Sequence, residues 1–182
     1  MLEHSIKIYE IMKKFFVITI FVLMCVSSIA QNLLFMGIDT EQSYISFNRS
    51  ISSKLTFQSE SDTYAAYSGT FAGLSDCWIT VTKSFSNTVH NIHVVCRGLS
   101  SDVINRMIAS YTEKYGRVYK TYQKSVNKGK DVATYYDYKV GLHKIEIEVI
   151  YYVSGGSYFG IKYLPRGFAN ENSNVRVNKG DI

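Results

Sequence analysis

The chain has 182 residues, with 20 Lys and Arg against 15 Asp and Glu, for a formal net charge of +5. Apolar residues make up 46% and charged residues 19%, which excludes a disordered tail or a low-complexity chain. A single proline excludes a Pro-rich linker, and three cysteines are too few for a disulfide-dense miniprotein.

Residues 1–30 have the pattern of a secretory signal peptide. Lys13-Lys14 gives a positive start, residues 15–24 are almost wholly apolar, and small residues stand at Ser28 and Ala30, where a signal peptidase reads. The apolar run is too short to span a bilayer of about 30 Å. We therefore expect export to the periplasm, the outer membrane or the cell surface, with no transmembrane segment after cleavage.

The start of the chain and its first cysteine need separate interpretation. Met12 directly precedes the two lysines, so residues 1–11 read as an upstream extension of the true start. A lipoprotein signal would place a lipidated cysteine after a small residue, but Met24 precedes Cys25 and is large for that position. We expect cleavage after Ala30 rather than lipid attachment at Cys25.

The first half of the mature chain reads as a helix followed by strands. Asp39 to Gln42 predicts a helix start of the capping-box type, and apolar residues recur at helical spacing from Tyr44 to Leu55. Alternating strands follow at 64–71, 77–82 and 89–96. On the last two strands one face carries Cys77, Ile79, Val81, Ile92, Val94 and Cys96, and the other carries Trp78.

The second half repeats this order of elements. Ser100 offers an N-cap, an apolar stripe at spacings of three and four runs from Ile104 to Tyr115, and Gly116 ends the helix. Strands are predicted at 118–125, 132–140, 143–153 and 158–164, before a polar tail at 165–182.

These elements predict an α+β fold. Residues 31–164 form one domain of two similar halves, 39–97 and 100–164, each with a helix followed by antiparallel strands. We expect the helices to pack on one face of an antiparallel sheet.

Two cysteines are predicted to face each other across a hairpin. If Ser86-Asn87 forms its tip, Cys77 and Cys96 are directly opposed, and Cα atoms in that position lie about 4.5–5.5 Å apart. That separation permits a disulfide, which an exported protein retains and which contributes about 3 kcal/mol in the chain-entropy model. Two buried free thiols are the alternative.

No catalytic or metal-binding pattern stands out. His90 and His93 are three apart in a strand and so point to opposite faces, which is poor spacing for a shared metal. Glu146 and Glu148 share a polar strand face, which alternation explains without catalysis. We expect no metal, no cofactor and, given the mild charge and export, no nucleic-acid partner.

Tyrosine is the one residue type in excess, with 15 in the chain. Most second-half tyrosines fit a structural use in strands. However, Tyr135-Tyr136 and Tyr151-Tyr152 are adjacent pairs. If the core lies on one face of the sheet, one tyrosine of each pair must point away from it. Exposed tyrosine is favoured at binding surfaces. The candidate binding residues are therefore Trp78, Tyr135, Tyr136, Tyr151 and Tyr152.

Three segments resemble a family of small exported proteins of Gram-negative gut bacteria that has no assigned function. They are residues 35–38 (FMGI), 69–77 (GTFAGLSDC) and 111–116 (YTEKYG). The element order also resembles the beta-lactamase inhibitor protein fold and small outer-membrane assembly lipoproteins. These likenesses imply an exported α+β protein and carry no activity to this chain.

The sequence therefore favours an exported, non-catalytic binding module whose partner is a protein held by the sheet face. A glycan or cell-wall ligand held by exposed tyrosines and Trp78 is the alternative. An enzyme is the least favoured interpretation.

Overall fold

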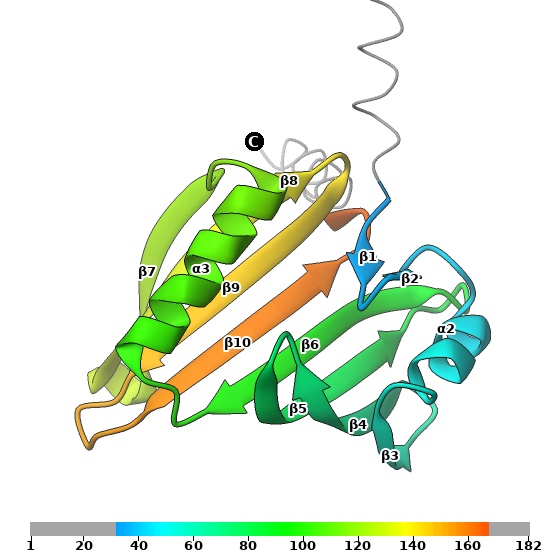
Figure 1. Cartoon of the computed structure of the whole chain (residues 1–182), viewed down its shortest axis with the longest axis horizontal. Helices are drawn as coiled ribbons and strands as arrows, with labels where there is room; N and C mark the ends of the chain where they lie inside the picture. The colour runs from blue at the N-terminus through cyan, green and yellow to red at the C-terminus, as the bar shows by residue number, and fades with distance from the viewer. Residues whose placement is uncertain (1–31, 168–182) are drawn as a thin grey trace, which may run out of the picture. The chain divides into compact units, whose positions relative to one another are not determined.

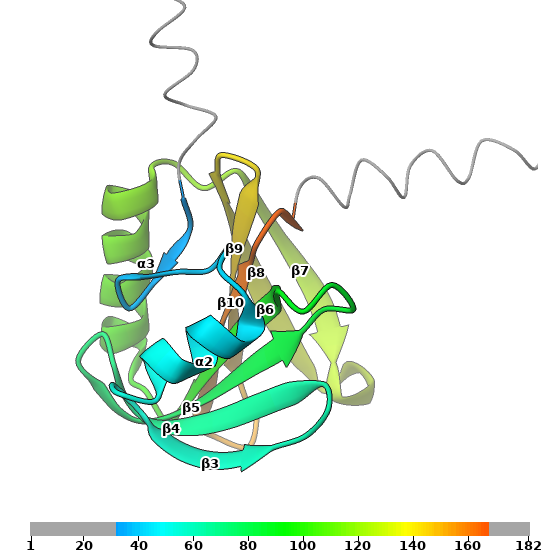
Figure 2. The ribbon, with the colours of Figure 1, turned by 90° about the vertical axis from the view of Figure 1, so that its right-hand side faces the viewer.

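Eight strands hydrogen-bond into one antiparallel sheet in the computed structural model, which describes residues 32–167 (Figure 1). Across the sheet their order is β3-β4-β5-β6-β10-β9-β8-β7, so the two halves meet where β6 pairs with β10. Figure 2 shows that the sheet bends between its two ends. The strands are β3 Thr56–Glu60, β4 Tyr64–Phe71, β5 Leu74–Lys83, β6 Val89–Arg97, β7 Lys120–Val126, β8 Asp131–Val140, β9 His143–Tyr151 and β10 Ser157–Leu164.

Two helices and a small hairpin complete the described structure. The helices are α2 (Tyr44–Ile51) and α3 (Ser101–Tyr115), and β1 (Leu34–Phe35) pairs with β2 (Ile38–Asp39). A 3-10 turn, η1 (Asn127–Gly129), links β7 to β8. This antiparallel sheet with two helices agrees with the predicted α+β class. The predicted signal peptide, Cys25 and the polar tail beyond residue 167 lie outside the described residues.

Helix α3 forms as the sequence predicts. The Ser100 side chain accepts a hydrogen bond from the Val103 amide, and Gly116 ends the helix with a φ of 84°. A φ in this region favours glycine, which explains why the helix stops there. Ile104, Met107 and Tyr111 are buried on one side of the helix, as the apolar stripe requires.

The predicted capping box at Asp39 is wrong. Asp39 belongs to β2, and its side chain accepts from the Glu41 amide instead of capping a helix. The backbone and hydroxyl of Thr40 both donate to the Leu33 carbonyl, so this segment is held as a hairpin. Helix α2 begins four residues beyond Thr40, with Ser43 as its N-cap.

The sheet has one apolar face and one mixed polar face. Apolar side chains of α2 and α3 belong to the same buried cluster as the first of these faces. We call it the core face, and its opposite the polar face. The core face carries Cys77, Ile79, Val81, Ile92, Val94, Cys96, Tyr138, Ile145, Ile147, Phe159 and Ile161.

Candidate functional site

One rung of the sheet aligns aromatic and charged side chains across the polar face. Directly opposed residues in neighbouring strands have Cβ atoms about 4.5–5.5 Å apart, so members of one rung form a continuous row. We call this row the aromatic rung. From β5 to β7 it consists of Trp78, Val95, Gly160, Glu148, Tyr135 and Tyr122.

At the β7 end of the rung two tyrosines stack face to face. The rings of Tyr122 and Tyr135 have centroids 4.8 Å apart and are inclined by 8°. The Tyr135 hydroxyl donates to Glu148 at 2.6 Å, and the Tyr122 hydroxyl donates to Glu146 at 3.2 Å. Burial and the bond to Glu148 raise the pKa of Tyr135, so its hydroxyl stays a donor at neutral pH.

Lysines of β7 place positive charge over this stack. The Lys120 Nζ lies 5.1 Å from the Tyr122 ring centroid, and Lys124 Nζ lies 5.3 Å from the same centroid and 5.4 Å from that of Tyr135. These distances are within the range of cation–π attraction. Both lysines are exposed, so this end of the rung presents ammonium groups to solvent.

Beside the rung, four charged side chains form a network that is largely buried. Lys144 pairs with Asp137 at 3.0 Å and with Glu146 at 3.4 Å, while Lys162 pairs with Glu146 at 3.1 Å. Burial acts to raise the pKa of Glu146, but the Lys162 hydrogen bond and the two lysine charges lower it overall. The carboxylate is therefore ionised at neutral pH.

Gly160 lets an aromatic ring lie over the middle of the rung. A Cβ at Gly160 would stand 2.8 Å from the Tyr158 hydroxyl oxygen and 2.9 Å from a ring carbon, so only glycine leaves room for this ring. The Tyr158 hydroxyl shares a hydrogen bond of 3.1 Å with His93 Nε2. Burial raises the pKa of Tyr158 to about 12 and lowers the pKa of His93.

The five predicted binding residues divide between the two faces. Trp78 and Tyr135 lie in the aromatic rung, and Tyr152 packs against the small apolar cluster that contains Tyr135. Tyr136 pairs with Ile147 and packs against the main core, and Tyr151 pairs with Ser157 on the core-face side. The structure thus brings three of the five to the polar face and separates the other two.

Sequence reasoning missed several residues of this site. Strand register is what brings Tyr122, Tyr158 and His93 into the site, and no local sequence pattern shows that register. Alternation places Glu146 on a polar strand face, but it does not show that two lysines hold this carboxylate there. The alternation of Lys144, Glu146 and Glu148 against apolar residues could have indicated one shared polar face, but not which strands would pair.

The predicted register around the two cysteines is confirmed. Trp78 pairs with Val95 and Ile79 with Val94, the register in which Cys77 opposes Cys96. Both cysteines are buried free thiols in this structure, and the Cys77 thiol donates to the Leu74 carbonyl at 3.4 Å. The neighbouring Cys77 and burial raise the pKa of Cys96. The disulfide itself stays a prediction.

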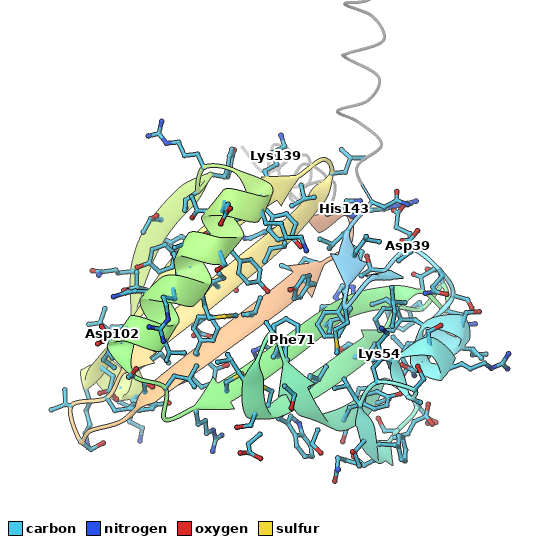
Figure 3. All side chains as sticks on the ribbon, viewed as in Figure 1. Asp39, Lys54, Phe71, Asp102, Lys139 and His143 are labelled. Atoms are coloured by element: carbon cyan, nitrogen blue, oxygen red, sulfur yellow. The ribbon has the colours of Figure 1, made fainter. Side chains whose placement is uncertain are left out.

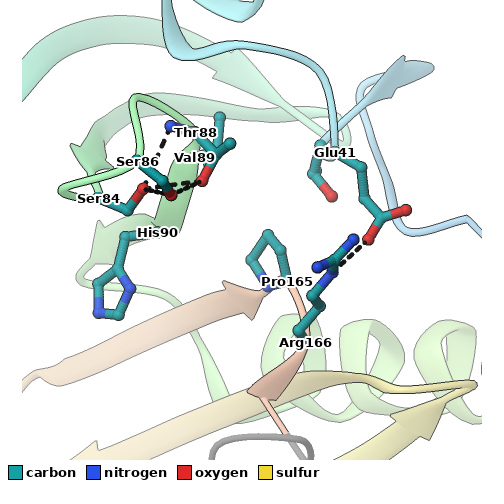
Figure 4. A pocket seen from close by; sticks show the side chains of 9 residues that line it. Glu41, Ser84, Ser86, Thr88, Val89, His90, Pro165 and Arg166 are labelled. Atoms are coloured by element: carbon teal, nitrogen blue, oxygen red, sulfur yellow. Dashed lines mark hydrogen bonds and ion pairs between the residues drawn. The ribbon is translucent and has the colours of Figure 1, made fainter.

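A second candidate region is a polar pocket of about 320 Å³ at the β5–β6 turn (Figure 4). The hydroxyls of Ser84, Ser86 and Thr88 hydrogen-bond to one another at 2.8–3.3 Å. Across the pocket Arg166 pairs with Glu41 at 3.0 Å. Within residues 32–167 no hydrogen bond joins a histidine to these hydroxyls.

Within the described part of the chain no group of three or more His, Cys, Asp or Glu side chains is placed to hold a metal ion. No helix between residues 32 and 167 has the length and apolarity needed to cross a membrane.

Comparisons of the chain with models of protein families, with curated proteins and with solved structures find no match. The resemblance to exported proteins of gut bacteria and to the beta-lactamase inhibitor protein fold therefore stays a prediction.

Proposed function

We propose that the protein is a binding module that holds a protein partner on the polar face of its sheet. The observation that carries this proposal is the aromatic rung, with an exposed Trp78 at one end and the Tyr122–Tyr135 stack at the other. Tryptophan and tyrosine are enriched among residues that dominate binding energy at protein interfaces. The ammonium groups of Lys120 and Lys124 favour a partner whose surface is acidic at this end.

The arrangement of the helices supports the same proposal. Buried residues of both helices share one cluster with the core face, which favours a molecule whose helices cover that face and leave the polar face open. The ion pairs of Lys144, Glu146 and Lys162 hold long side chains in place there. Side chains ordered before binding lose less conformational entropy when a partner docks.

Export and a disulfide belong to the same proposal. The signal peptide at 1–30 would deliver the chain to the periplasm or outer envelope, where Cys77 and Cys96 would be oxidised to a disulfide. Thiol titration of denatured, unreduced protein from that compartment tests this: we expect no reactive thiol from this pair. Two reactive thiols would exclude the bridge.

The function is tested by capturing partners from a native envelope extract on immobilised protein. We expect one protein to be recovered near stoichiometry by the wild type. Trp78→Ser and Lys124→Ser should each weaken its capture about tenfold. Tyr151→Ser is the matched control, because Tyr151 is 50% exposed, close to the 46% of Trp78, but lies on the core-face side. Equal loss in all three variants would contradict the proposal.

Glycan binding is the second candidate, and the exposed ring of Trp78 is the observation that favours it. Sugar rings pack on flat aromatic faces, with carboxylates such as Glu148 accepting from their hydroxyls. Competition with cell-wall oligosaccharides distinguishes the two candidates. Capture that oligosaccharide abolishes favours the glycan, whereas capture that it leaves unchanged favours the protein partner.

A further inference from the structure

A second cavity, separate from the polar face, lies between α3, the β1–β2 turn and the β4–β5 turn. This groove has a volume of about 340 Å³. Its walls are mainly apolar and include Met36, Phe71 and Met107, with Phe71 labelled in Figure 3. Known ligand pockets span about 300–1,000 Å³, so this one suits a single ring or a short chain.

The groove also contains a buried pair of tyrosine hydroxyls. Tyr111 of α3 and Tyr163 of β10 line it and are hydrogen-bonded to each other through their hydroxyl groups. Their residues are only 7% and 4% exposed. Two hydroxyls carry two protons, and the bond between them uses one. Within residues 32–167 no acceptor is bonded to the second proton, so the pair can still donate one hydrogen bond to a further acceptor.

The hydroxyl pair acts as a donor across the ordinary pH range. Burial is the largest effect that raises the pKa of Tyr111 and of Tyr163 above the usual value for tyrosine. A bound molecule must therefore bring an acceptor oxygen to this point. A buried donor without an acceptor is costly, which gives binding of an acceptor a clear source of stabilisation.

The charge of the lining indicates which acceptor fits. Lys114 is the charged residue of the groove lining, and its Nζ lies 5.1 Å from the ring centroid of the neighbouring Tyr115. A cation in the lining of the same groove as a donating hydroxyl pair favours a carboxylate over a neutral carbonyl.

Two tight turns fix the rim opposite α3. Met36 and Ala72 have φ values of 51° and 50°, and each is followed by a glycine with positive φ, which is the type I′ pattern of two-residue hairpins. Left-handed backbone at non-glycine residues is uncommon and is often found at ligand-binding sites. Both turns line the groove, so three segments far apart in the sequence, 35–38, 69–77 and 111–116, meet at it.

We propose that this groove binds a small apolar carboxylic acid. Its ring or short chain would pack against Phe71 and Met107. One carboxylate oxygen would accept the second proton of the Tyr111–Tyr163 pair, and Lys114 would supply the compensating charge. This site is independent of the polar face, so either proposal can fail without the other.

The test measures binding of phenylacetate and hexanoate to the purified protein by calorimetry and by NMR shifts of the groove residues. Phenylacetamide serves as the uncharged probe of the same shape. We expect both acids to bind, and we expect the amide to bind at least about tenfold more weakly than phenylacetate. No binding of either acid up to its solubility limit, or equal binding of acid and amide, would overturn the proposal.

Substitutions in the groove lining test whether the acids bind there. Tyr111→Phe combined with Tyr163→Phe removes the donors and should weaken acid binding about tenfold or more, and Lys114→Gln should weaken it less. Tyr138→Phe is the control for a buried hydroxyl, because Tyr138 bonds to Thr112 and lies outside the groove lining. Lys120→Gln is the control for charge, because its Nζ lies 5.1 Å from a tyrosine ring as well. Equal weakening by the controls would overturn the site.

Discussion

The two faces of the second-half strands use tyrosine in opposite ways. On the core face the hydroxyls of Tyr138 and Tyr163 bond to hydroxyls of α3, so neutral groups are paired inside the molecule. On the polar face Tyr122 and Tyr135 donate to carboxylates, and Tyr158 bonds to His93. The position of a tyrosine along its strand, odd or even, therefore decides whether its hydroxyl supports the core or a charged surface.

The largest expected effect is a difference in the free energy of unfolding between substitutions on the two faces. Ile147→Ala on the core face should lower the free energy of unfolding by about 2–5 kcal/mol, because its side chain is fully buried in the main cluster. Ile150→Ala on the polar face should cost less, because its cluster contains only three buried residues and can collapse more easily. Urea unfolding measures both. An equal or larger loss at Ile150 would contradict the assignment of the two faces.

The next effect concerns the ion pairs of the polar face. Glu146→Gln removes the carboxylate between Lys144 and Lys162 and should cost about 1–3 kcal/mol at pH 7. Because the pKa of Glu146 is lowered in the folded protein, its contribution is complete above its unfolded pKa of about 4.3. The contribution is lost as the pH falls through the lowered folded pKa.

Urea unfolding of wild type and variant across pH measures this contribution. The difference in stability between the two proteins should stay constant from pH 7 to about 5 and shrink as the pH falls from there toward 2. A difference that stays constant over that range would show that the carboxylate charge is not what stabilises the network.

The smallest expected effect concerns the ring over Gly160. Gly160→Ala should displace Tyr158 and break its bond to His93, at a cost of about 1 kcal/mol. Burial lowers the pKa of His93 in the wild type, so exposing the imidazole should raise this pKa toward the usual value of about 6.5. NMR titration of the His93 ring follows the change. An unchanged pKa would mean that Tyr158 does not shield this histidine.

Local patterns in the sequence predicted those elements of the fold whose signals lie within the element itself. The stripe of α3, its Ser100 cap and its Gly116 stop are local signals, and they gave the helix correctly. The short strands β1 and β2 were missed, because the hydrogen bonds of Thr40 to Leu33 that stabilise them come from tertiary structure.

The candidate site was less accessible from sequence because it depends on which strands pair. The sequence allows Trp78 and Tyr135 to be selected as aromatic residues that could point away from the core. It does not show that they share a rung, because that requires β6 to pair with β10. Tyr136 and Tyr151 had the same local appearance and lie on the other face. No periodicity within one strand distinguishes these two outcomes.

The most direct test of the proposed function is quantitative capture of an envelope protein by wild type, Trp78→Ser and Tyr151→Ser. Binding through the polar face predicts that Trp78→Ser loses about nine tenths of the captured partner at limiting concentration, while Tyr151→Ser captures as much as the wild type. Capture that is unchanged in Trp78→Ser and lost in Tyr151→Ser would place the interface on the opposite side of the sheet and contradict the central claim.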